Sequence, residues 1–139
     1  MFENKRYAQA LVAFQRAGQS RMVGICQAFL LRENARAVPD DQVKERADAF
    51  VEAGEAFSTC ASHALLPDQK GEQMECYSNA AECFIQGSRL KEAGECFVRA
   101  EKYSKAARAY REGAYFDEMV EVLYSKSTGL RLNPVFSLS

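Results

Sequence analysis

The sequence has no strong excess of charge of either sign, because 19 acidic residues balance 18 lysine and arginine residues. The resulting net charge of −1 gives no global reason to expect binding to nucleic acid or to anionic lipid. No apolar run approaches the ~20 residues that cross a bilayer, and no apolar signal segment follows Met1. With 47% hydrophobic residues in a chain of 139, the composition is typical of one globular domain, and we expect no membrane association.

Residues and motifs that carry chemistry are also scarce. The eight glycines are scattered singly, and no G-x-x-x-x-G-K-[ST] loop is present to hold phosphates. Cys60 and His63 lie three residues apart and Cys76 follows, but zinc needs four ligands, or three and a water. A nucleophilic cysteine would need a base, and His63 is the only histidine. We therefore predict a protein that is not an enzyme, with no catalytic residue, no metal and no cofactor.

The five cysteines form no disulfide-like framework, and their number is odd. Such cysteine usage is typical of a reducing compartment rather than of a secreted protein. We expect an intracellular protein, cytoplasmic or nuclear, whose thiols are free.

What the sequence does contain is a repeat of thirteen residues, seen in segments 80–87, 93–100, 106–113 and 119–123. The first three segments begin with alanine, continue with a small residue followed by an aromatic one, and end with glycine or alanine. Segment 7–18 has the same pattern. Apolar positions three and four apart predict helices, and thirteen residues hold a helix of ~10 residues and a tight turn. Cys83 and Cys96 occupy equivalent small positions, which predicts burial in the core.

Two longer helices are predicted between the repeat blocks. An apolar stripe with a spacing of seven residues runs through Val43, Phe50, Phe57 and Ala64. Asp40 is the expected N-cap of this helix, and Asp68, after Pro67, is the expected N-cap of the next one.

The predicted fold class is therefore all-α, with antiparallel helical hairpins stacked into a solenoid and no strand. We expect seven helices, at about 4–17, 20–36, 41–64, 69–86, 90–100, 104–112 and 116–125. The repeat domain would cover residues 1–126, followed by an irregular tail or severed linker at 127–139.

Segments 5–10, 102–106 and 115–119 resemble the helix starts of tetratricopeptide-like repeats, in which an aromatic residue precedes the helix and an alanine follows one turn later. The period differs, because a tetratricopeptide hairpin uses about 34 residues and two units here use 26. More narrowly, segments 2–10 and 31–37 resemble the tetratricopeptide-like region that follows a UvrD-like superfamily-1 helicase core in proteins of the tetratricopeptide-and-ankyrin-repeat type. The resemblance implies that the chain is an accessory region of a larger helicase-like protein.

Basic residues recur at every third position between residues 99 and 111. They are Arg99, Lys102, Lys105, Arg108 and Arg111. They are the candidate contact residues for a protein partner or for backbone phosphates. The alternative is a solvated face, since Glu95, Glu101 and Glu112 lie nearby in the sequence.

The expected function is that of a non-catalytic scaffold that presents a helical surface to a protein or peptide, or to an adjacent domain of the same chain. The alternative is an accessory nucleic-acid-contacting module of a helicase-like protein. Apolar residues also crowd the C-terminal end, in segment 119–124 and at Leu130, Leu132, Val135, Phe136 and Leu138. This end could therefore self-associate when it lacks a cover.

Overall fold

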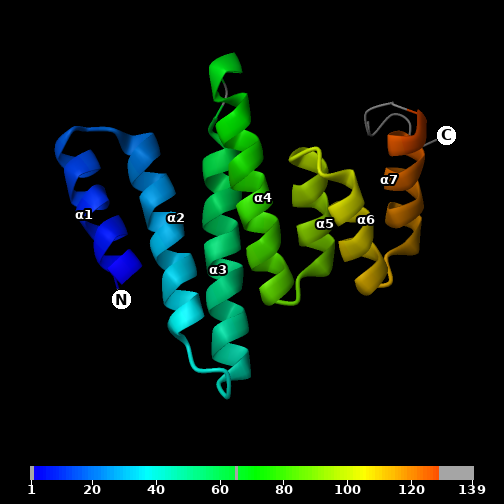
Figure 1. Ribbon diagram of the computed structural model, residues 1–139, viewed down its shortest axis with the longest axis horizontal. Helices are drawn as coiled ribbons and strands as arrows, with labels where there is room; N and C mark the ends of the chain where they lie inside the picture. Colours follow the sequence, from blue (N-terminus) through cyan, green and yellow to red (C-terminus); the bar gives the residue numbers. More distant parts are fainter. Residues whose placement is uncertain (1, 65, 129–139) are drawn as a thin grey trace.

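The computed structural model describes residues 2–64 and 66–128, which form seven α-helices and no strand within these ranges (Figure 1). The helices are α1 (Phe2–Arg16), α2 (Ser20–Ala37), α3 (Val43–Ser62), α4 (Lys70–Gln86), α5 (Leu90–Arg99), α6 (Tyr103–Glu112) and α7 (Phe116–Thr128), and a 3₁₀ turn, η1 (Pro67–Gln69), precedes α4. The all-α prediction is confirmed. None of the described helices combines the length and the apolar character that a membrane span requires.

The helix ends agree with the predicted ones to within three residues. The largest difference is at α7, which continues to Thr128 and so includes the start of the expected tail. The rest of that tail, 129–139, lies outside the described residues, and the domain boundary at 126 stays a prediction.

Both predicted N-caps are wrong. Helix α3 begins at Val43 with Gln42 as its N-cap, so Asp40 lies too far upstream to cap it. Asp68 lies within η1, and Gln69 occupies the N-cap position of α4. The side chain of Gln69 instead accepts a hydrogen bond from the backbone N–H of Leu66, at 3.2 Å. The helix starts are thus set by the turns before them and not by a capping carboxylate.

The helices follow one another in a single row, from α1 at one end to α7 at the other, and they alternate in direction (Figure 1). Each helix packs mainly against its neighbours in sequence. Helices α3 and α4 form the centre of the row, and the shorter helices α5, α6 and α7 follow them (Figure 1).

The thirteen-residue repeat has a structural basis in three equivalent turns. Ser88, Glu101 and Ala114 all have positive φ angles, of 62°, 59° and 63°. In each turn the N–H of the next residue donates to the carbonyl of the aromatic residue five positions before it, at 2.7–2.8 Å. This pairing is the Schellman motif, which usually has glycine at the left-handed position. Gly18 occupies that position in the turn after α1.

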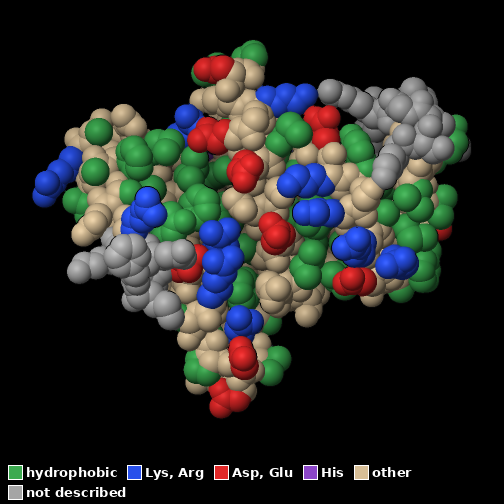
Figure 2. Space-filling model, viewed as in Figure 1, with side chains coloured by type: hydrophobic (Ala, Val, Ile, Leu, Met, Phe, Trp, Pro, Cys, Tyr) green, Lys and Arg blue, Asp and Glu red, His purple; other side chains and the backbone are tan. Residues whose placement is uncertain are grey.

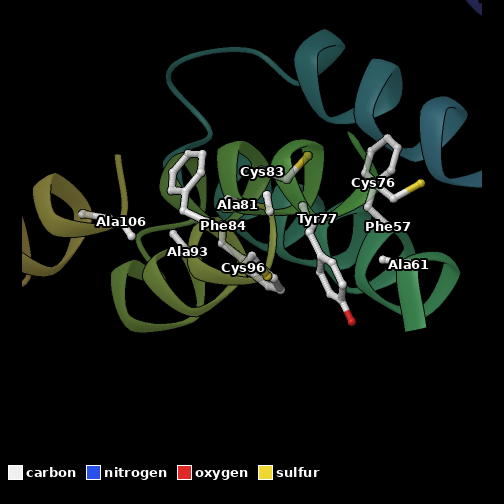
Figure 3. Close-up of a cluster of buried hydrophobic side chains, with 14 of the residues drawn as sticks. Phe57, Ala61, Cys76, Tyr77, Ala81, Cys83, Phe84, Ala93, Cys96 and Ala106 are labelled. Atoms are coloured by element: carbon white, nitrogen blue, oxygen red, sulfur yellow. The ribbon is translucent and has the colours of Figure 1, made fainter. Parts of the chain in front are cut away.

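The core is built from alanines and aromatic residues at matching repeat positions. Ala80, Ala93 and Ala106 are fully buried, and the aromatic residues four positions later, Phe84, Phe97 and Tyr110, are at most 6% exposed. Figure 3 shows this layer of small, sulfur-containing and aromatic side chains between α3, α4, α5 and α6. The predicted burial of Cys83 and Cys96 is confirmed.

Small residues let the helices approach closely. A Cβ atom on Gly94 of α5 would lie 2.5 Å from the ring of Tyr110 on α6. A Cβ atom on Gly54 of α3 would likewise lie 3.1 Å from the ring of Phe84 on α4. In both pairs an aromatic ring of one helix rests against a small residue of the preceding helix.

Three of the four residues in the predicted stripe are buried, and Val43 is the exception. Phe50 and Phe57 are buried, whereas Val43 is 71% exposed because it begins the helix and has no neighbouring turn to cover it. Ala64 is buried although it lies beyond the end of α3.

Candidate functional site

The five predicted contact residues lie on α5, on α6 and in the turn between them, and all five are exposed. Figure 2 shows basic side chains gathered over this part of the molecule, with isolated acidic side chains among them. Their surroundings divide them into two groups.

Three of the five are held by contacts within the chain. The guanidinium of Arg99 donates to the hydroxyl of Tyr77 on α4 at 3.4 Å and lies 5.6 Å from the ring centroid. This hydrogen bond raises the pKa of the Arg99 guanidinium above its ordinary value. Lys102 Nζ donates to Ser78 Oγ at 2.9 Å, and Lys105 Nζ lies 5.9 Å from the ring centroid of Phe97. The contacts of Arg99 and Lys102 tie the α5–α6 hairpin to α4, and the contact of Lys105 joins α6 to α5.

Arg108 and Arg111 have no acidic partner among the described residues. A step of three residues turns back by about 60° on a helix of 3.6 residues per turn. Arg111 therefore lies about a third of a turn away from Lys105 around α6. The basic residues follow a spiral and not a straight ridge, and Arg108 and Arg111 form its unpaired end.

A second basic site, which the sequence did not suggest, lies between α2, α3 and α4. It is a surface pocket of about 220 Å³, lined by Arg32, Arg36, Arg46, Phe50, Glu82, Cys83 and Gln86. The three arginines come from two helices that are joined by a turn, and the packing of α4 closes the site. Only the spacing of Arg32 and Arg36, which puts them on one face of α2, is a signal that the sequence carries.

Aromatic rings hold two of these guanidinium groups. The Cζ atom of Arg32 lies 4.8 Å from the ring centroid of Phe29 and 5.7 Å from that of Phe57. The Cζ atom of Arg46 lies 5.0 Å from the ring centroid of Phe50. Stacking on aromatic faces is a common way in which proteins fix arginine side chains.

The carboxylates near the pocket differ in how closely they pair with the arginines. Glu33, only 10% exposed, accepts a hydrogen bond from Arg36 at 2.8 Å and lies 3.6 Å from Arg32 Nε. Asp40 lies 3.6 Å from Arg46 Nε but is 98% exposed. At 3.6 Å these carboxylates are just too far to hydrogen-bond the Nε atoms of Arg32 and Arg46, which are buried and make no hydrogen bond within the described part of the chain. The pocket thus retains donor capacity.

The surroundings of the cysteine side chains do not favour the thiolate, which is the reactive form of cysteine. All five are unpaired, and four are buried. Burial raises the pKa of Cys76, Cys83 and Cys96 to about 11 in each case, and the nearby Arg32 and Arg36 lower that of Cys83 only in part. These side chains are neutral at pH 7 and act as small apolar core residues.

The motif of Cys60, His63 and Cys76 does not form a recognisable metal centre. His63 is exposed at the C-cap of α3, while Cys76 is buried in α4. In residues 2–64 and 66–128, no group of three or more His, Cys, Asp or Glu side chains is placed to hold a metal ion.

The outer face of α7 carries exposed apolar side chains. Phe116, Val120 and Leu123 are 55%, 59% and 44% exposed. Their spacing of four and three residues places them on one side of the helix. In the repeat, Val120 is equivalent to Ala81, Gly94 and Ala107, all of which are buried.

Comparisons of the chain with protein-family models, with curated proteins and with solved structures find no match in any of the three.

Proposed function

We propose that this protein is a non-catalytic helical-repeat scaffold whose outer α7 face binds an amphipathic helix, from a protein partner or from another domain of a larger chain. The observation that carries the proposal is the exposed apolar stripe of Phe116, Val120 and Leu123. Such a face is the usual docking surface for a helix with apolar residues at matching steps.

The register of the repeat indicates how the partner helix would lie. Tyr110 of α6 rests on Gly94 of α5, and Phe84 of α4 rests on Gly54 of α3. Val120 is the α7 equivalent of Gly94, and its side chain is 59% exposed. A further helix in the same register would place an apolar residue against Val120 and so extend an arrangement that is already used within the chain.

This proposal includes a tetratricopeptide-like solenoid architecture and, more narrowly, a position beside a helicase core in a larger protein. Sequential packing of neighbouring helices supports the solenoid. The five unpaired thiols support a reducing compartment, cytoplasmic or nuclear.

A second copy of the chain can serve as the test partner. We expect weak, concentration-dependent self-association in sedimentation experiments, because each copy offers the apolar side of α7. Val120→Lys should remove it, since a charged side chain would have to be desolvated at the contact. Val43→Lys is the matched control, because Val43 is equally apolar and exposed but lies at the far end of α3. A strictly monomeric wild type, or equal loss in both variants, would contradict the proposal.

The second candidate function is that of an accessory nucleic-acid-contacting module. It is favoured by Arg108 and Arg111, which are exposed and have no acidic partner in the described ranges. Binding to single-stranded DNA should then weaken steeply with salt, and Arg108→Gln should reduce the salt slope by about 1. Binding that is absent, or insensitive to salt, would exclude this function.

A further inference from the structure

We propose that the three-arginine pocket formed by Arg32, Arg36 and Arg46 binds a phosphate group. This pocket is separate from the α7 face, so the inference goes beyond the proposed function. If the pocket does not bind phosphate, the proposed function is unaffected.

The geometry points to an anion because guanidinium donors from two helices face one cavity. Arg32 and Arg36 reach it from α2, and Arg46 reaches it from the start of α3. The Nε atoms of Arg32 and Arg46 are buried and make no hydrogen bond within the described part of the chain, because the carboxylate oxygens of Glu33 and Asp40 with which they pair lie 3.6 Å away. A buried N–H group of a charged side chain strongly favours an acceptor, and an anionic oxygen is the best one.

The guanidinium groups are held in place before any ligand arrives. Arg32 stacks against Phe29 and Phe57, and Arg46 stacks against Phe50. Arg36 is fixed by its hydrogen bond to Glu33, yet 52% of its side chain is exposed. Fixed donors reduce the entropy that binding would otherwise cost.

A phosphate fits this set better than a carboxylate does. It offers at least three acceptor oxygens, one for each guanidinium, whereas a carboxylate offers two. The volume of about 220 Å³ accommodates either group. Glu82 also lines the pocket and would repel an anion, but it is exposed and can turn toward solvent. The Gln86 side chain at the rim adds an amide donor.

The test is an NMR titration of the whole chain with inorganic phosphate at constant ionic strength, read at the Nε–Hε signals of the arginines. We expect saturable shifts of the Arg32 and Arg46 signals. Arg36→Gln and Arg46→Gln should each weaken phosphate binding at least fivefold, and Arg16→Gln, which removes an exposed arginine at the end of α1, should change it less than twofold. Acetate should bind at least fivefold more weakly than phosphate.

A phosphoserine peptide and its unphosphorylated form distinguish the two sources of the phosphate. Tighter binding of the phosphopeptide than of inorganic phosphate indicates a modified protein as the source, and weaker binding indicates a small phosphate compound. Linear shifts without saturation, equal affinity for acetate, or an equal loss in Arg16→Gln would overturn the proposal. Melting curves of Arg36→Gln and Arg46→Gln check that both variants are folded, and Arg36, the more exposed residue, is the one less coupled to the core.

Discussion

At the scale of single residues, the stability of this protein depends on aromatic side chains that rest against alanine or glycine. Phe97 is 2% exposed and Tyr110 is 4% exposed, and the latter meets Gly94 so closely that a methyl group would not fit without movement. The hydrogen bond from Lys102 to the buried Ser78 is part-buried, and a single hydrogen bond contributes less than a buried ring does. The core positions should therefore dominate the response to mutation.

Phe97→Ala should lower the free energy of unfolding by about 3–5 kcal/mol, because it removes a buried ring and leaves a cavity. Urea unfolding followed by circular dichroism measures this difference. Val43→Ala is the control, with an expected change below about 0.5 kcal/mol. A loss below about 1 kcal/mol for Phe97→Ala would mean that the ring is not part of the core.

The buried thiols predict how stability depends on pH. Cys76, Cys83 and Cys96 have folded-state pKa values of about 11, above the ordinary value of 9.0, because burial disfavours the thiolate. Between these values the folded state binds more protons than the unfolded state, so stability falls as pH rises from 9 to 11. Below pH 9 the thiols are protonated in both the folded and the unfolded state, so the full stability should be present.

Unfolding in urea at several pH values tests this dependence. Cys83→Ala and Cys96→Ala should each make the free energy of unfolding fall less steeply between pH 9 and 11. Each substitution removes one thiol whose pKa differs between the folded and the unfolded state. An unchanged slope in both variants would show that other groups are responsible.

At the scale of elements, the helices are short and their ends are set by turns. Ser88, Glu101 and Ala114 adopt the left-handed conformation that glycine tolerates best, and they do so at the same place in three consecutive turns. The strain is offset by the hydrogen bonds that close each turn and by the packing of the aromatic residue whose carbonyl accepts one of them. This repeated turn explains why the period is thirteen.

Ala114→Gly should raise stability by up to about 1 kcal/mol, because glycine adopts φ near 63° without the clash of a Cβ atom. Arg108→Gly, in the middle of α6, should instead lower it by about 1 kcal/mol. Thermal and urea unfolding of both variants provide the comparison. A loss of stability in Ala114→Gly would contradict the account of the turn.

The elements were largely predictable because apolar positions and turns recur in one register. The spacing of Phe84, Phe97 and Tyr110 was enough to place three helices. The caps at Asp40 and Asp68 were not predictable, because the exact start of a helix depends on the local turn and not on the nearest carboxylate.

The arginine pocket could not be found from the sequence for a different reason. Arg32 and Arg46 lie on different helices, and only the packing of α2, α3 and α4 brings them to one cavity. The basic residues of α5, α6 and the turn between them were visible as a pattern, but their grouping depends on the contacts of Arg99 with Tyr77 and of Lys102 with Ser78, which lie more than twenty residues earlier.

At the scale of the whole molecule, the helices form a row whose members contact chiefly their neighbours (Figure 1). Such a row buries each helix between two others except at its ends. The inner positions Ala81, Gly94 and Ala107 are buried, while their equivalent Val120 is 59% exposed on the last described helix. We propose that a partner helix covers this exposed face of α7.

The most direct test compares the same charged substitution at two equivalent positions of the repeat. Ala107→Lys should lower the free energy of unfolding by more than about 3 kcal/mol, because it places a charge between α6 and α7. Val120→Lys should change it by less than about 0.5 kcal/mol, because that side chain already faces water in the free chain. If Val120→Lys is as destabilising as Ala107→Lys, the α7 face is covered within the chain itself and is not open to a partner.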